Sequence, residues 1–256
     1  MWKFKYALVR VALIAIVLIT ASMWSCAKKE VRKEYVAPKE AYENALKLMD
    51  DREYEKARDA FTEVRNRDDS KTYAHLAQLK MAETYIQDEE FELAIEEYRK
   101  FLKLYPDNKY APYAQYRIAS IYFDRIEGAD RGYRWAENAI TEFNRLNEMF
   151  PRNQYREIIQ MRIEKSKNIL AAHEHYVARF YYKKGSFMAA IGRLRAVLDK
   201  YPEYKYIDDI YYVMGASFME LGKKEEAVEY LKKAVAASTD KKLIRDAQNA
   251  ISSLGK

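Results

Sequence analysis

The chain has 256 residues, of which 49% are hydrophobic and 33% charged, and its net charge is +6. Charges of both signs alternate along the sequence, which is typical of solvated helical faces and argues against a basic surface that follows nucleic-acid phosphates. Only 5 Pro and 7 Gly interrupt long stretches with helical periodicity, so the composition predicts an all-α chain without an internal disulfide framework.

The first 25 residues have the layout of a secretory signal peptide. Lys3, Lys5 and Arg10 form a basic start, and an apolar core follows. The uncharged run Val11–Trp24 has 14 residues, fewer than the roughly 20 that a membrane-spanning helix needs. Removal of residues 1–25 as a leader would lower the net charge to +3.

The only cysteine, Cys26, follows the leader directly. The four residues Met23 to Cys26 resemble the box at which bacterial lipoproteins are cleaved and their cysteine is acylated with palmitate. Trp24 is bulkier than the small residue usual there, and a plain signal peptide or an uncleaved anchor is the alternative. Ala27 in place of Asp favours the outer membrane in that resemblance. Residues 26–38 are polar and predict a flexible tether.

Behind the tether, a helix-turn-helix pattern recurs five times and predicts a tetratricopeptide-repeat superhelix of about five helix pairs. Each pair places a small residue where its two helices cross, which lets the backbones approach closely. These small residues are Ala45 and Ala57, Ala82 and Ala94, Ala119 and Ala139, Ala178 and Ala190, and Gly215 and Ala227. Residues 241–254 predict a helix that caps the open end of the stack.

The repeats are unequally spaced, because the third carries an insertion at Arg125–Arg134 and the fourth begins with an unusually long helix. Tyr155–Lys184 contains no Gly or Pro in thirty residues, so that helix would span about 45 Å. We expect it to join an N-terminal half, residues 39–151, to a C-terminal half, residues 152–256.

Three runs carry a resemblance to one family: EEYRKFLKLYPDNKYAPYAQYRIASIYF at 96–123, AITEFNRLNEMFPRNQY at 139–155, and AAHEHYVARFYYKKGSFMAAIGRLRAVLDKYP at 171–202. They resemble the BamD family of tetratricopeptide lipoproteins, also known as YfiO or ComL, which belong to the outer-membrane β-barrel assembly machinery. The resemblance covers about residues 35 to 250 and is most specific in the third run.

The resemblance implies a periplasmic scaffold that is lipid-anchored at the outer membrane and promotes folding and insertion of outer-membrane proteins. Its N-terminal repeats would bind unfolded substrates, and its C-terminal repeats would dock on a BamA-type barrel protein, with other assembly-machinery lipoproteins as further partners. The family's docking arginine matches Arg193, although Gly192 stands where the family often has Asn, and Lys184 replaces a common Arg. His175 and Arg179, four residues apart on one helix, are expected to form a polar spot in the same half.

The first helix of each pair lines the concave wall of such a stack, which independently predicts substrate-contacting residues. In the N-terminal half the stripe facing away from the second helix holds Tyr42, Leu79, Glu83, Tyr113 and Tyr116. Aromatic and apolar side chains flanked by charge suit an extended or amphipathic peptide. The alternative is that these tyrosines only fill the core.

The residue pattern predicts a protein that is not an enzyme and needs no cofactor or metal. His173 and His175 lie two apart on a helix and do not share a face, so they do not form a metal pair. No phosphate-binding glycine loop and no metal-spaced Cys/His cluster occurs in the sequence. A different tetratricopeptide lipoprotein, such as a secretin pilotin or a Tol-Pal-type envelope coordinator, is the alternative function, and a peptidoglycan-acting enzyme is the most distant one.

Overall fold

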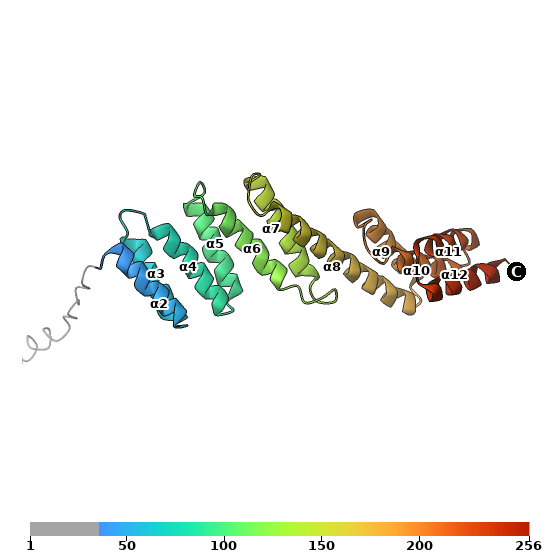
Figure 1. Ribbon diagram of the computed structural model, residues 1–256. Coiled ribbons are helices and arrows are strands. Elements are labelled where there is room, and N and C mark those ends of the chain that lie inside the picture. The colour runs from blue at the N-terminus through green and yellow to red at the C-terminus, as the bar shows by residue number, and fades with distance from the viewer. Residues whose placement is uncertain (1–35, 256) are drawn as a thin grey trace, which may run out of the picture. The chain divides into compact units, whose positions relative to one another are not determined.

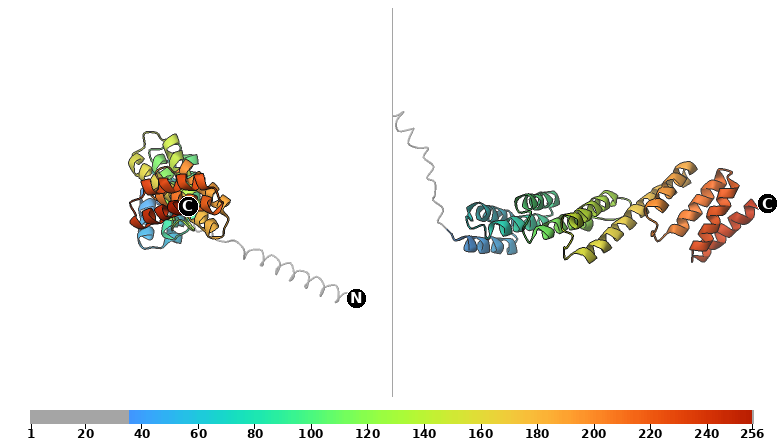
Figure 2. Two further views of the ribbon diagram at one scale, coloured as in Figure 1. Left: turned by 90° about the vertical axis from the view of Figure 1, so that its right-hand side faces the viewer. Right: turned by 90° about the horizontal axis from the view of Figure 1, so that it is seen from above.

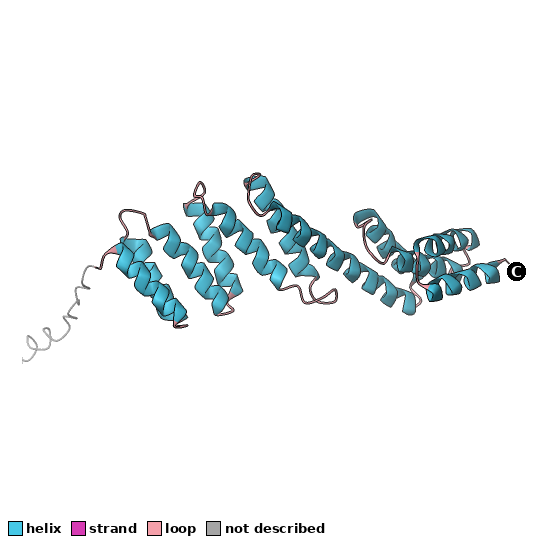
Figure 3. Ribbon diagram, in the orientation of Figure 1, coloured by secondary structure: helices cyan, strands magenta, loops and turns pink. Residues whose placement is uncertain are grey.

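The structure, a computed structural model, describes residues 36–255. In that range it consists of helices joined by turns and loops (Figure 1, Figure 3). The leader, Cys26 and most of the tether lie outside the described residues. The helices in this range are α2 (Pro38–Asp50), α3 (Tyr54–Arg67), α4 (Ala74–Gln87), α5 (Phe91–Leu104), α6 (Ala111–Asp124), α7 (Tyr133–Met149), α8 (Arg156–Lys183), α9 (Phe187–Lys200), α10 (Ile207–Glu220), α11 (Lys224–Ala237) and α12 (Lys241–Leu254). The prediction of an all-α tetratricopeptide-repeat fold is confirmed.

Each helix packs on the next one in the chain, and α12 packs on α11 and closes the stack. The view from above in Figure 2 shows the pairs following one another in chain order from α2 to α12. Pro38–Lys256 forms one compact unit. Within residues 36–255, none of the helices combines the length and the apolar character that crossing a membrane requires.

The small residues at the helix crossings are all buried, as the sequence predicts. The nine crossing alanines are fully buried. Gly215 shows how close this approach is, since a Cβ there would lie 2.7 Å from Leu231 Cγ and 3.0 Å from the Leu231 backbone nitrogen. The small residues therefore set the spacing within each pair.

Four of the five turns between the two helices of a pair share one geometry. Residues Arg52, Glu89, Gly185 and Gly222 have φ values of 62°, 59°, 75° and 71°. The amide of the next residue donates a hydrogen bond to the carbonyl five residues back, as Glu90 does to Tyr85 and Ser186 does to Tyr181, both at 2.9 Å. This is the Schellman ending, in which a left-handed residue terminates the helix and satisfies its free carbonyls.

The third pair departs from this turn, because the inserted residues connect α6 to α7. The loop covers residues 125–132, so the last two residues of the predicted insertion belong to α7. The Arg125 guanidinium lies between the rings of Phe91 and Trp135, 4.5 Å from each. The Nδ1 atom of His173 on α8 lies 2.7 Å from the carbonyl oxygen of Ala129 in this loop. The insertion thus packs on α8.

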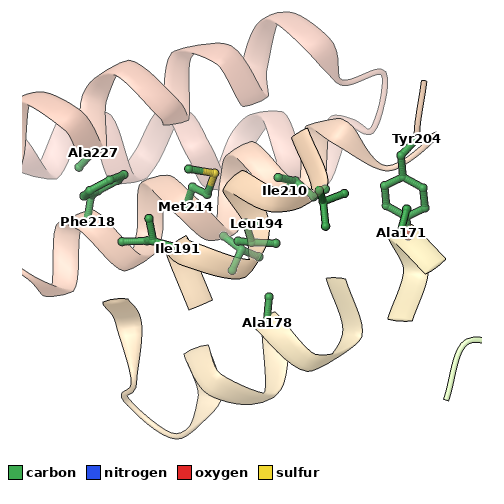
Figure 4. Packing of buried hydrophobic residues seen from close by; sticks show 11 residues of the cluster. Ala171, Ala178, Ile191, Leu194, Tyr204, Ile210, Met214, Phe218 and Ala227 are labelled. Atoms are coloured by element: carbon green, nitrogen blue, oxygen red, sulfur yellow. The ribbon is translucent and has the colours of Figure 1, made fainter. Parts of the chain in front are cut away.

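The long helix α8 matches the predicted range Tyr155–Lys184, whose two terminal residues cap the 28-residue helix. Its C-terminal part belongs to the largest of the buried clusters, in which side chains of four helices meet (Figure 4). The labelled side chains come from α8 (Ala171, Ala178), α9 (Ile191, Leu194), the turn before α10 (Tyr204), α10 (Ile210, Met214, Phe218) and α11 (Ala227). Its N-terminal part packs through Ile159 and Ile163 on α6 and α7. A division into two functional halves at residue 151 stays a prediction.

Candidate functional site

A hollow of about 800 Å³ opens between the first helices of the N-terminal pairs and the turns that precede α6 and α8. We call it the groove. Its lining includes Tyr42, Leu79, Lys80, Glu83, Lys109, Tyr110, Tyr113, Arg152 and Tyr155. The groove is framed by α2, α4 and α6 because the first helix of each pair faces it, whereas the second helix packs behind.

Four of the five residues predicted for the groove line it: Tyr42, Leu79, Glu83 and Tyr113. The fifth, Tyr116, lies behind the lining and stacks on Tyr155, with ring centroids 4.2 Å apart and planes 9° apart. Leu79 is 5% exposed and also belongs to the hydrophobic core, so its side chain forms part of the apolar base of the groove and does not project into it. Whether these side chains contact a substrate stays a prediction.

Glu83 organises the polar side of the groove. Its Oε1 accepts a hydrogen bond of 2.9 Å from the Tyr113 hydroxyl, and its Oε2 accepts one of 2.7 Å from Lys80. Burial and then the Glu83 charge raise the pKa of Tyr113 to about 12, and the same two causes raise the pKa of Tyr42 to about 12. Both phenols are therefore protonated near neutral pH, and Tyr113 donates its hydroxyl proton to Glu83.

Positive charge lies at the other end of the groove, on the turns before α6 and α8. Lys109, before α6, has its Nζ 5.0 Å from the centroid of the Tyr110 ring. Arg152, before α8, has no ion-pair partner within residues 36–255. Asn108 and Asn153 each accept a hydrogen bond of 2.9 Å from the backbone amide two residues on, which places the next tyrosine at the start of a helix. The groove thus offers aromatic faces, phenol donors and charges of both signs to an extended peptide.

The residues predicted to dock a partner belong to separate contacts on and around α8. His175 and Arg179 do share a polar spot, because both approach Asp209 on α10: His175 Nε2 lies 2.7 Å from Oδ2, and Arg179 donates to the same oxygen. Burial would raise the pKa of Asp209, but His175 and Arg179 outweigh it and hold the pKa below its usual value. His175 is only 7% exposed, so it braces the spot from inside.

Arg193 on α9 pairs instead with Glu174 on α8, its Nη1 donating a hydrogen bond of 2.7 Å to Oε2, and it lies over the Tyr181 ring. Lys184 ends α8 and lies 5.8 Å from the centroid of the Phe180 ring. The Arg193–Glu174 pair thus joins α9 to α8, whereas the Arg179–Asp209 pair joins α8 to α10.

Sequence reasoning missed several residues that complete these sites. Tyr155, Arg152 and Asp209 are polar or aromatic residues at or near the first turn of a helix, and the recurring segments YPDNKY, FPRNQY and YPEYKY are the signal that could have identified the two turn residues. Tyr176 and Phe180, one turn apart on α8, are 63% and 53% exposed, which is unusual for large aromatic side chains.

Several known proteins are similar to this chain. Residues 34–253 match the family model described as YfiO, outer membrane lipoprotein. The chain is 27% identical over 218 residues to the outer membrane protein assembly factor BamD of Caulobacter vibrioides, covering 84% of this chain and 72% of that protein. It is 27% identical over 219 residues to BamD of Rickettsia prowazekii, covering 85% and 87%. Among solved structures, it is similar to the TPR2AB-domain:pHSP90 complex of yeast Sti1, with a TM-score of 0.46, 14% identity and 84% of each chain covered.

Proposed function

Because this chain belongs to the YfiO family of outer membrane lipoproteins, we propose that it is a non-catalytic scaffold of the β-barrel assembly machinery. Its curated relatives are outer membrane protein assembly factors, which supports a role in assembling outer-membrane proteins. In this proposal the protein is anchored through Cys26 at the periplasmic face of the outer membrane and promotes the folding and insertion of β-barrel proteins.

The groove is proposed to hold segments of unfolded outer-membrane proteins. The supporting observation is that Tyr42, Glu83 and Tyr113 from three successive first helices line one hollow. A strand that is still unpaired has free backbone amides and carbonyls as well as alternating side chains. Phenol hydroxyls and the Glu83 carboxylate can bind such backbone groups, while the ring faces contact aromatic or aliphatic side chains.

The C-terminal half is proposed to dock on a BamA-type barrel protein, with Arg193 as the central contact. Arg193 has a side chain that is 39% exposed, and its pairing with Glu174 holds the guanidinium in place on the surface. Exposed Phe180 and Lys184 lie at the C-terminal end of α8, the helix that carries Glu174. They add an apolar and a cationic contact. Arg179 and His175 support this end of α8 through Asp209.

The experiment is an affinity purification of the tagged full-length protein from detergent-solubilised envelopes, with co-purifying proteins identified by mass spectrometry. The wild type is expected to recover a BamA-type barrel protein. Arg193→Glu should reduce this recovery at least about tenfold, because it places a charge of the wrong sign against the partner. Helix content by circular dichroism should not change.

Arg67→Glu is the matched control, since Arg67 forms a comparable surface ion pair with Glu63 at 2.7 Å but lies on α3. It should leave the recovery unchanged. Recovery of other envelope proteins without a BamA-type barrel would contradict the proposed function. Equal loss with Arg67→Glu would show that the effect of Arg193→Glu is not local.

A further inference from the structure

A single arginine on the long helix holds the aromatic wall of the groove from behind. Arg162 on α8 donates a hydrogen bond of 2.7 Å from Nη1 to the buried Ser120 hydroxyl on α6. Its guanidinium carbon also lies 4.8 Å from the centroid of the Phe123 ring and 5.4 Å from that of the Tyr116 ring. All three partners are on α6, so Arg162 bridges α8 to the helix that forms the groove.

The contact continues from Tyr116 to the groove itself. The Tyr116 and Tyr155 rings are nearly parallel at 4.2 Å, and Tyr155 lines the groove while Tyr116 does not. Tyr155 is fixed at two further points: its backbone amide donates to Asn153 Oδ1 and its hydroxyl accepts from Gln154 Nε2, both at 2.9 Å. Arg162 therefore contacts Tyr116, and Tyr116 contacts Tyr155. Of these three residues, only Tyr155 lines the groove and can contact a bound molecule there.

We propose that Tyr155 is the subsite for one aromatic side chain of the segment bound in the groove, and that Arg162 is its positioning residue. The proposal rests on the peptide-binding function proposed for the groove. A ring that is already stacked on one side and held at its backbone and hydroxyl is pre-organised, so a second aromatic ring can stack on it with little loss of conformational freedom. Stacking on such a ring favours an aromatic over an aliphatic side chain of similar size by up to about tenfold.

Arg162 suits this role for a geometric reason. Its planar guanidinium can lie against ring faces and donate to Ser120 at the same time, whereas a lysine ammonium provides only a point charge. Without Arg162 the Tyr116 side chain loses the group that fixes it from α8, and Tyr155 loses its fixed neighbour. The loss should appear as reduced selectivity for aromatic over aliphatic peptides.

The test measures binding of two fluorescein-labelled peptides to the full-length protein in detergent, by fluorescence anisotropy. One peptide alternates Phe with Thr, and the other has Leu in place of every Phe. The wild type is expected to bind the Phe peptide about tenfold more tightly. Tyr155→Leu and Arg162→Ala should reduce this ratio to within about twofold, because binding of the Phe peptide weakens more than binding of the Leu peptide. Arg162→Lys should give an intermediate ratio.

Arg58→Ala is the matched control. Arg58 lies over the Tyr85 ring at 4.6 Å and pairs with Asp88 at 2.9 Å, but it lines a different surface on α3. It should retain the full aromatic preference. An unchanged ratio with Arg162→Ala overturns the positioning role, and an unchanged ratio with Tyr155→Leu overturns the subsite. If the wild type binds neither peptide, the peptide-binding function of the groove is wrong and this inference fails with it.

Far-ultraviolet circular dichroism reports whether each variant is folded. If Arg162→Ala unfolds, Tyr155→Leu and Arg162→Lys still decide the proposal through the same ratio. Near-ultraviolet circular dichroism adds an independent measurement, because loss of the fixed Tyr116–Tyr155 stack should reduce the tyrosine signal in Arg162→Ala but not in Arg58→Ala.

Discussion

Tyr113 on α6 and Glu83 on α4 meet across the groove, where the tyrosine hydroxyl donates a hydrogen bond of 2.9 Å to Glu83 Oε1. The bond ties together the first helices of two successive pairs. It also keeps a phenol and a carboxylate in one orientation on the groove wall. The groove is therefore a pre-organised surface, and its stability should respond to the ionisation of the tyrosine.

Alkaline pH should destabilise the protein. The pKa of Tyr42, Tyr113 and Tyr204 is raised to about 12 by burial first and then by neighbouring charges or phenols. The unfolded chain loses these protons near pH 10, about two units earlier, so it binds fewer protons than the folded state between about pH 10 and 12. The contribution of these tyrosines to the free energy of unfolding should thus be constant below about pH 9 and fall above about pH 10.

Urea unfolding at a series of pH values, followed by circular dichroism, measures this decline. Tyr113→Phe should fall less steeply, because it removes one of the shifted groups and keeps the ring. A decline that is as steep in Tyr113→Phe as in the wild type would mean that Tyr113 does not contribute to it.

Two helical glycines should respond in opposite ways to alanine. Gly215→Ala places a Cβ 2.7 Å from Leu231 Cγ and 3.0 Å from the Leu231 backbone nitrogen, so α10 and α11 must move apart. We expect a loss of about 1–3 kcal/mol in the free energy of unfolding. Gly192→Ala on α9 meets no atom within 4 Å and should gain about 0.5–1 kcal/mol from reduced backbone entropy of the unfolded chain.

Urea denaturation of both variants gives the two changes directly. A loss with Gly192→Ala as large as that with Gly215→Ala would show that the helix spacing is not what limits residue size at position 215.

The same Gly192→Ala variant tests the neighbour of Arg193, because recovery of the partner protein should be unaffected by a change that only rigidifies α9.

Asp209 should stabilise the protein above acidic pH. Its pKa is lowered because His175 and Arg179 outweigh the effect of burial. The stabilisation is present above the usual Asp pKa of about 3.9 and is lost as pH falls through the lower folded value. Asp209→Asn should cost about 1–2 kcal/mol at neutral pH, a figure reduced for the half-exposed Arg179 side chain.

The difference between Asp209→Asn and the wild type should shrink as the pH of the urea titration falls below about 4. Asp199→Asn, which changes an exposed carboxylate on α9, should track the wild type at every pH. A constant difference down to about pH 2 would indicate that the Asp209→Asn substitution disturbs packing and not an ion pair.

Membrane attachment should depend on Cys26. Cys26→Ser is expected to release the protein from membranes and to abolish incorporation of radiolabelled palmitate, because the thiol is the group that would be acylated. Trp24→Ala, which replaces the bulky residue in the box, should keep or increase incorporation. Retention of Cys26→Ser through an uncleaved leader would show that the protein is not lipid-anchored.

Local spacing in the sequence was enough to predict which residues are buried at the helix crossings, but not which residues line the groove. Ala57 and Phe61 lie four apart on one helix, and Ala82 and Ala94 lie at the crossing of two consecutive helices, so local spacing was enough to predict their burial. The stripe that holds Glu83 and Tyr113 follows from the same periodicity. By contrast, Tyr116 and Leu79 share that stripe, yet one lies behind the groove lining and the other is mostly buried.

The sequence by itself determined the helix pairs, the small residues at their crossings, the long helix and the family, because these depend on spacing within a few helical turns. Only the tertiary structure decided which side chains meet across helices. Arg162 and Ser120 are 42 residues apart, and Arg179 and Asp209 are 30 apart. These contacts join helices of successive pairs, so they depend on how each pair is rotated on the next, which spacing within one pair does not determine.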